Sequence, residues 1–192
     1  LIDILSRFLE PYEPEESFNN SEMERGNELE PYAVAELNKY TGLEFNEVGW
    51  LQSDEIPLIG ISPDGITDDD RFSCEIKCVS RKKHTEIMVN NVVPMDYIHQ
   101  CVHYFTINPK LEKHYFAAFR PENILVPLFV KELTRESVVD LGLKKKIEIE
   151  QVGKKGTPIK SKIKTVPDLR TINEWVKLSR LLAKEMQLEI NK

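Results

Sequence analysis

The chain lacks a long apolar run, a cysteine pattern and a repeat. No apolar stretch approaches the roughly 18 residues that a membrane-spanning helix needs, so we expect no membrane partner. Cys74, Cys78 and Cys101 show no metal-ligand spacing and are too few for a four-cysteine iron–sulfur cluster. A shared strand would hold the first two about 13 Å apart, too far for a disulfide. We therefore expect buried free thiols in a reducing cytoplasm.

Positive charge is scarce in the first part of the chain and concentrated near its end. The net charge of −6 argues at first against a nucleic-acid partner. However, residues 1–70 hold 18 acidic and 3 basic side chains, whereas residues 144–170 hold 9 basic and 3 acidic ones. This asymmetry suggests a basic surface segment that contacts phosphates, although a solvated lysine-rich loop explains the composition equally well. The candidate DNA contacts are Lys154, Lys155, Lys160 and Lys162.

With 192 residues, the chain is long enough for one domain with a substantial core and short for two. The residue pattern predicts helices over residues 1–9, 21–42, 95–107, 134–143 and 169–190. It predicts strands over residues 45–51, 57–61, 72–79, 114–119 and 124–130, and a mobile basic loop over residues 144–164. Strands in a run between flanking helices indicate an α/β (α+β) fold with a central mixed sheet.

Two short segments carry the chemistry, residues 62–65 (Ser-Pro-Asp-Gly) and residues 74–77 (Cys-Glu-Ile-Lys). Residues two apart in a strand share a face, so Glu75 and Lys77 point away from the apolar residues that alternate with them. A Glu-x-Lys pair alone is more often the solvent side of a strand. The Pro-Asp-Gly turn adds Asp64 at the end of the neighbouring strand, so the two carboxylates converge if the strands pair.

Two converging carboxylates repel each other and need a cation. Oxygen ligands of this kind suit Mg²⁺ or Mn²⁺ rather than zinc. Such an ion lowers the pKa of bound water and polarises a phosphoryl oxygen. Lys77 beside it can orient the attacking water and offset negative charge in the transition state. These groups together predict a phosphodiester hydrolysis site.

This constellation resembles the PD-(D/E)XK nuclease signature, and further motifs narrow the resemblance. Residues 25–33 resemble the Arg-Gly-x-x-x-Glu-x-x-Ala helix of the lambda-exonuclease (YqaJ-type) viral recombinases. Residues 62–65 match their Ser-Pro-Asp-Gly, residues 75–78 resemble their Glu-Leu-Lys-Cys, and residues 97–100 resemble their Tyr-x-x-Gln helix. The motifs occur in the family's order and cover roughly residues 20–120. The resemblance implies a restriction-endonuclease-like core.

The resemblance also implies a role for each matching residue. Asp64, Glu75 and Glu30 would bind metal through their carboxylates and Ile76 through its backbone carbonyl, with two ions in the site. Lys77 would assist the nucleophilic water. Taken alone, Glu30 is more simply a solvated side chain beside an apolar helix stripe.

Two parts of the family pattern are incomplete in this chain. Gln100 matches the first glutamine of a Gln-x-Gln pattern and is counted among the catalytic residues, but Val102 occupies the second position. The family also has an N-terminal segment that holds the DNA 5′-phosphate, and no segment here matches it. Arg7 and Ser62 are the candidate contacts for that phosphate, and the chain does not begin with Met, so we expect further residues upstream.

The leading hypothesis is one nuclease domain over residues 1–192, with an N-terminal segment (1–20), a catalytic core (21–130) and C-terminal helices with the basic loop (131–192). The resemblance implies a Mg²⁺-dependent 5′-to-3′ exonuclease of linear double-stranded DNA that makes single strands for recombination. It further implies a homotrimeric ring, a single-strand annealing protein as partner, and phage origin within a bacterial host. The alternatives are a PD-(D/E)XK endonuclease or repair nuclease, and a degenerate nuclease fold that only binds, which predicts a lost carboxylate or lysine.

Overall fold

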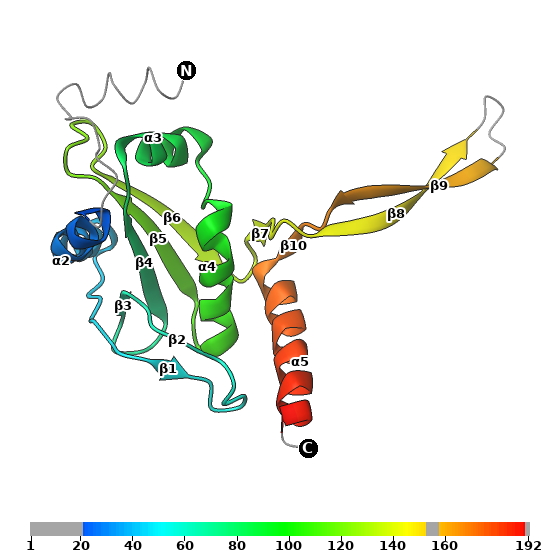
Figure 1. The fold of residues 1–192 in the computed structure, drawn as a ribbon, viewed down its shortest axis with the longest axis horizontal. Helices are drawn as coiled ribbons and strands as arrows, with labels where there is room; N and C mark the ends of the chain where they lie inside the picture. Colours follow the sequence, from blue (N-terminus) through cyan, green and yellow to red (C-terminus); the bar gives the residue numbers. More distant parts are fainter. Residues whose placement is uncertain (1–20, 153–157, 191–192) are drawn as a thin grey trace.

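The centre of the molecule is a mixed four-stranded β-sheet in the order β3-β4-β5-β6 (Figure 1). The computed structural model describes residues 21–152 and 158–190. The strands of this sheet are β3 (Gly65–Ile66), β4 (Phe72–Cys78), β5 (Lys113–Phe119) and β6 (Leu128–Thr134). Strands β4 and β5 run parallel, whereas β3 and β6 pair antiparallel with their neighbours. The predicted central mixed sheet is thereby confirmed.

Helices cover both faces of this sheet, as predicted. They are α2 (Ser21–Thr41), α3 (Arg81–Asn90), α4 (Met95–Ile107) and α5 (Ile172–Ile190). In Figure 1, α2 lies on one side of the sheet, and α4, with α5 beside it, lies on the other. Cys74 and Ile76 of β4 pack in the core cluster beneath α2, whereas Phe105 and Phe116 belong to the cluster beneath α4. Strand β4 is therefore covered on both faces, and its polar residues Ser73 and Glu75 are buried rather than in solvent.

The long first helix ends where its sequence predicts. Gly42 follows α2 with a φ of +71°, a left-handed conformation that glycine adopts without steric cost. Its N–H donates to the carbonyl of Asn38 at 2.9 Å, which satisfies one of the free carbonyls at the end of the helix. The position of α2 across the sheet, and with it the position of Glu30, follows from this long uninterrupted helix.

Helix α3 was not predicted from the sequence. Ser80 caps its N-terminus by accepting a hydrogen bond from the N–H of Lys83, and Asn91 closes the other end with a φ of +52°. The helix buries few apolar side chains, and instead encloses His84 and Thr85. A mostly polar helix has no strong apolar periodicity, so the only available signal was Ser80 as a capping residue.

The helix predicted over residues 134–143 is wrong. Strand β6 continues to Thr134, and the Oγ of Ser137 accepts a hydrogen bond from the N–H of Thr134 in a turn. The chain then forms β7 (Val138–Val139), which pairs with β10 (Arg170–Thr171). Two adjacent β-branched valines favour this extended pairing over a helix, because their side chains are restricted against a preceding helical turn.

The prediction of a mobile loop over residues 144–164 is also wrong. Strands β8 (Lys144–Val152) and β9 (Pro158–Pro167) form an antiparallel hairpin that reaches away from the body of the molecule (Figure 1). We call this hairpin the arm. The β-branched residues Ile147 and Ile163 recur among its lysines, which favours strands. The lysines of this segment favoured a solvated loop, whereas the isoleucines that alternate with charged residues indicated strands.

The two strands predicted over residues 45–51 and 57–61 shorten to β1 (Leu51–Gln52) and β2 (Gly60–Ile61). Upstream of β1, Asn46 makes only an isolated bridge to Ile66, with both backbone hydrogen bonds near 3.0 Å. The strand expected over residues 124–130 begins later, at Leu128. The helix expected over residues 1–9 lies outside the described residues.

Two predictions concern the state of the cysteines and the absence of a membrane-spanning helix. All three cysteines are free thiols; Cys74 and Cys101 are buried and Cys78 is partly buried. Among the helices in residues 21–152 and 158–190, none has the length and apolar character to cross a bilayer.

Candidate active site

The pairing of β3 with β4 brings Asp64 onto the edge of strand β4. The register joins Gly65 to Cys74 and Ile66 to Ser73, so the turn residue Asp64 lies beside the residues that follow Cys74. Its Oδ2 accepts a 2.6 Å hydrogen bond from the backbone N–H of Ile76. The convergence that depended on strand pairing is therefore present.

Glu75 is the most deeply buried charged residue of this cluster, with 1% of its surface exposed. Its Oε1 forms an ion pair with the Nζ of Lys77 on the same strand. Its Oε2 accepts a 2.5 Å hydrogen bond from the hydroxyl of Tyr104 on α4. The Lys77 side chain is 30% exposed, and its Nζ lies 5.7 Å from the ring centroid of Tyr97. The lysine thus connects the buried carboxylate with the surface.

The backbone of Ile76 offers a further oxygen to the same site. In a strand, the N–H and C=O of one residue point to the same side. The N–H of Ile76 points to Asp64, so its carbonyl lies on that edge as well. In the described part of the sheet, β3 pairs with β4 only at Ser73 and Cys74, so no strand lies beside Ile76 on this edge. The carbonyl is therefore positioned to act as a ligand.

The electrostatics of the site favour a cation. Burial, with the negative charge of Glu75 as the next cause, raises the pKa of Asp64 from 3.8 to about 6, against the opposing effects of the Ile76 N–H and Lys77. Burial acts to lower the pKa of Lys77, but the charge of Glu75 and its hydrogen bond outweigh it, so the net shift is upward. A buried pair of carboxylates with one lysine leaves negative charge that a further cation would neutralise.

The remaining predicted residues of the core lie around this cluster. Glu30, half-buried on α2, is close enough that its charge also raises the pKa of Asp64. Gln100 reaches the site indirectly, because its Nε2 donates at 3.4 Å to the hydroxyl of Tyr104. Ser62 is exposed, and its carbonyl lies 3.1 Å from the same hydroxyl.

The predicted DNA-binding lysines lie elsewhere. Lys154 and Lys155 are outside the described residues, and Lys160 and Lys162 belong to β9 of the arm. Figure 1 shows the arm on the far side of α4 and α5 from β3. Within one protomer, strand β9 therefore lies away from the turn that carries Asp64.

The oxygen donors fit a hard divalent ion, with side chains supplying only part of the coordination. In residues 21–152 and 158–190, no three His, Cys, Asp or Glu side chains gather as a complete set for a metal. Asp64, Glu75 and the carbonyl of Ile76 nevertheless form an all-oxygen set at one strand edge. Mg²⁺ is usually held by one or two carboxylates and keeps several waters, so this set suits Mg²⁺ or Mn²⁺.

Tyr104 is the member of the cluster that was not predicted. It follows Gln100 by four residues, and residues i and i+4 share one face of a helix. That spacing was the available signal. A buried hydroxyl needs a partner, and here the partner is Glu75.

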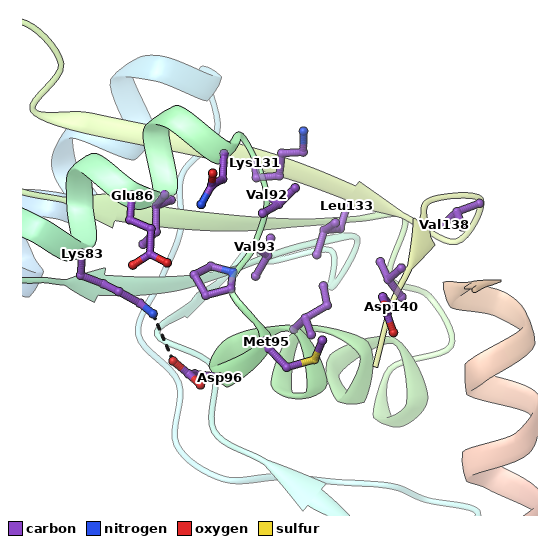
Figure 2. A pocket seen from close by; sticks show the side chains of 15 residues that line it. Lys83, Glu86, Val92, Val93, Met95, Asp96, Lys131, Leu133, Val138 and Asp140 are labelled. Carbon is purple, nitrogen blue, oxygen red and sulfur yellow. Dashed lines mark hydrogen bonds and ion pairs between the residues drawn. The ribbon is translucent and has the colours of Figure 1, made fainter. Parts of the chain in front are cut away.

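A pocket of about 500 Å³ lies apart from this cluster (Figure 2). Residues of α3, the start of α4, β6 and β7 line it, and an ion pair between Lys83 and Asp96 lies at its rim. Asp64, Glu75 and Lys77 do not belong to its lining. This pocket is therefore separate from the place where the charged groups converge.

The sheet, its flanking helices and the carboxylate–lysine cluster define a nuclease fold of the lambda-exonuclease type. A model of the YqaJ-like viral recombinase domain matches residues 2–109, more than half of the chain, and the chain belongs to that family. Two solved structures are similar. An alkaline exonuclease from Laribacter hongkongensis (LHK-Exo) is 29% identical with a TM-score of 0.54. The complex of LHK-Exo with dAMP is 28% identical with a TM-score of 0.53.

Both alignments cover 62% of this chain and 61% of the solved structure, so the chain spans less than two thirds of the length of these structures. No curated protein matches the chain. The fold and family are thereby established, and the roles of the individual site residues remain predictions.

Asp64 gives a prediction for stability in the absence of metal. Its pKa is about 6 in the folded protein and 3.8 is its ordinary value, so ionisation destabilises the native state. This cost is absent below about pH 4, grows between the two pKa values and is complete above about pH 6. We expect Asp64→Asn to raise the free energy of unfolding by about 1–2 kcal/mol at pH 8, but not at pH 4. Urea denaturation in EDTA measures both values.

Asp96→Asn is the matched control, because Asp96 is an ion-paired carboxylate that is 69% exposed. We expect this variant to be no more stable than the wild type at pH 8. A gain of equal size for Asp64→Asn at pH 4 and pH 8 would contradict the assignment of the raised pKa.

Proposed function

We propose that the protein is a Mg²⁺-dependent exonuclease that degrades linear double-stranded DNA from 5′ to 3′ and leaves single strands for phage-type recombination. The observation that carries the proposal is the convergence of Asp64, Glu75 and Lys77 at one edge of β4. Membership of the viral recombinase family and similarity to an alkaline exonuclease support it. We place this activity in the cytoplasm of a bacterial host.

Each group at the site has a distinct task in this proposal. Asp64, Glu75 and the carbonyl of Ile76 would hold two Mg²⁺ or Mn²⁺ ions, with Glu30 contributing from α2. The bound ion supplies an acidified water and charge neutralisation at the phosphate. Lys77 orients the attacking water and stabilises the negative charge that develops on the phosphoryl oxygens. Gln100 acts through Tyr104, and Ser62 contacts the terminal phosphate.

The runner-up is a PD-(D/E)XK endonuclease or repair nuclease with the same chemistry. One gel assay separates the two, in which linear duplex labelled at the 5′ or 3′ end is compared with covalently closed circular duplex. Loss of the 5′ label as mononucleotide from linear DNA, with an intact circle, supports the exonuclease. Nicking of the closed circle supports the endonuclease and overturns our proposal. Earlier loss of the 3′ label would indicate degradation from 3′ to 5′ and would contradict the proposed polarity.

The arm is proposed to contact the DNA backbone. We expect replacement of Lys154, Lys155, Lys160 and Lys162 by alanine to weaken DNA binding and to flatten its salt dependence. The slope should fall by about 0.9 log–log unit for each lost phosphate contact, because each contact releases a counterion. Fluorescence anisotropy on labelled duplex at several salt concentrations measures the slope.

A control variant removes the same charge from other places. Lys39, Lys110, Lys113 and Lys184 are exposed lysines in ion pairs on the body of the molecule. We expect their fourfold replacement to leave the slope nearly unchanged. If the arm variant and the control have equal slopes, the arm lysines are solvated and do not contact the DNA phosphates.

A ring of three subunits around DNA is proposed from the family resemblance. The outer surface of α5 exposes Leu181, Leu182 and Met186, which are between 56% and 59% exposed. Exposed apolar side chains on one helix are compatible with a subunit contact. We expect a trimer by light scattering after gel filtration, and processive digestion in the presence of competitor DNA. A monomer at micromolar concentration with distributive digestion would exclude the ring.

A single-strand annealing protein is proposed as the partner that receives the product strand. We expect co-elution of the two proteins in gel filtration, and no loss of nuclease activity when they bind. Binding that requires DNA would argue against a direct contact.

A further inference from the structure

The hydroxyl of Tyr104 lies where three parts of the candidate site meet. It donates to the Oε2 of Glu75 at 2.5 Å and lies 3.1 Å from the carbonyl of Ser62, next to the Pro-Asp-Gly turn. The Nε2 of Gln100 donates to it at 3.4 Å. Only 2% of Tyr104 is exposed, so water does not replace these contacts. One phenol therefore connects β4, the turn before β3 and helix α4.

The hydroxyl of Tyr104 donates its single hydrogen bond to Glu75. A phenol has one proton to donate, and an ionised carboxylate is a stronger acceptor than a backbone carbonyl. The carbonyl of Ser62 is the weaker second acceptor, and the Nε2 amide of Gln100 donates a hydrogen bond to the phenol oxygen. With Lys77 on Oε1 and Tyr104 on Oε2, each oxygen of Glu75 has a hydrogen-bonded partner. The carboxylate is held in one orientation before any ligand arrives.

The ring that carries the hydroxyl is itself anchored to strand β4. Tyr104 stacks on His114 of β5 with ring centroids 4.4 Å apart and planes 21° apart. The Nδ1 of His114 lies 2.8 Å from the Oγ of Ser73, which precedes Glu75 by two residues on β4. His114 is fully buried, so this support cannot swing into solvent. Strand β4 thus holds the phenol through Ser73 and His114, and the phenol contacts Glu75 on the same strand.

We propose that Tyr104 is a positioning residue that orients Glu75 for divalent metal binding. The inference rests on the proposed metal-dependent function. Glu75 is only 1% exposed, and such a carboxylate binds a metal less tightly when its orientation is free. Removal of an outer partner of a ligand typically weakens metal binding about 10–100-fold. A tyrosine that only fills space would affect folding and leave metal affinity unchanged.

The test is titration of Mn²⁺ alone, without DNA, into the wild type and Tyr104→Phe by isothermal calorimetry. Phenylalanine keeps the ring stacked on His114 and removes only the hydroxyl. We expect Mn²⁺ to bind about tenfold or more weakly to Tyr104→Phe, while urea denaturation in EDTA still shows a folded protein. The control is Tyr115→Phe, a buried tyrosine whose ring meets Phe45 on the other face of the sheet. It should bind Mn²⁺ within about twofold of the wild type.

Equal Mn²⁺ affinity of the wild type and Tyr104→Phe overturns the inference. If Tyr104→Phe does not fold, the double variant Glu75→Gln/Tyr104→Phe decides, because it removes the charge that lost its partner. Recovery of a folded protein supports the action of the phenol on Glu75, and failure to recover identifies a packing role and overturns it. Absence of Mn²⁺ binding by the wild type would instead overturn the proposed metal-dependent function.

Discussion

Replacement of Lys77 by alanine is expected to lower the rate of DNA cleavage by about 10²–10³-fold. DNA affinity in the presence of Ca²⁺ should stay within about threefold, because the lysine acts on the transition state rather than on the bound duplex. The structural basis is the position of its Nζ, which is ion-paired with Glu75 and 30% exposed at the strand edge that carries Asp64. Single-turnover cleavage and anisotropy measure the two quantities.

Lys83→Ala is the matched control for this variant. The Lys83 side chain is also 30% exposed and ion-paired, in this case with Asp96 at the rim of the separate pocket. Both variants lose one positive charge and one ion pair, and only Lys77 lies beside the carboxylate cluster. A Lys77→Ala protein that cleaves at nearly the wild-type rate, or an equal loss in both variants, would move the active site elsewhere.

Removal of divalent metal is expected to abolish cleavage completely. The ligands proposed for the ion are oxygens of Asp64, Glu75 and Ile76, and they hold a net negative charge that repels phosphate when no cation is bound. EDTA should therefore reduce the rate to background, and Mg²⁺ or Mn²⁺ should restore it. Undiminished cleavage in EDTA would contradict the mechanism.

Asp64→Asn tests the same point without a chelator. The amide can still accept the hydrogen bond from Ile76, but it carries no charge for a metal. We expect both Mn²⁺ affinity and cleavage to fall together, and Asp96→Asn to retain both. Loss of cleavage with unchanged metal affinity would assign Asp64 a different role.

The core of the candidate site was predictable because its residues are close in sequence and lie on regular elements. Asp64 and Glu75 are eleven positions apart, joined by one short turn between paired strands, so local rules of strand alternation placed them together. The turn residues and the period of the strand sufficed for this step. The motif order also indicated the family, which the match over residues 2–109 confirms.

Long-range contacts escaped the same reasoning. Tyr104 meets Glu75 across 29 positions, and the partner of a buried hydroxyl depends on how α4 packs on the sheet. The arm was predicted as a loop because its lysines indicated solvent exposure. The pairing of β8 with β9 depends on cross-strand contacts, which the sequence of one strand does not reveal. Helix α3 buries His84 and Thr85 alongside a single apolar residue, Ile87, which leaves little periodic signal.

Sequence alone determined the mixed α/β class, the long helix that ends before Gly42, and the local convergence of Asp64 with the Glu75-x-Lys77 pair. These features depend on backbone period, turn chemistry and capping, which act over a few residues. The tertiary structure decided that Glu75 lies buried beneath α4, with Tyr104 on one oxygen and Lys77 on the other. Burial and partner choice depend on the packing of elements distant in sequence, and that packing sets the charge balance in which a metal would bind.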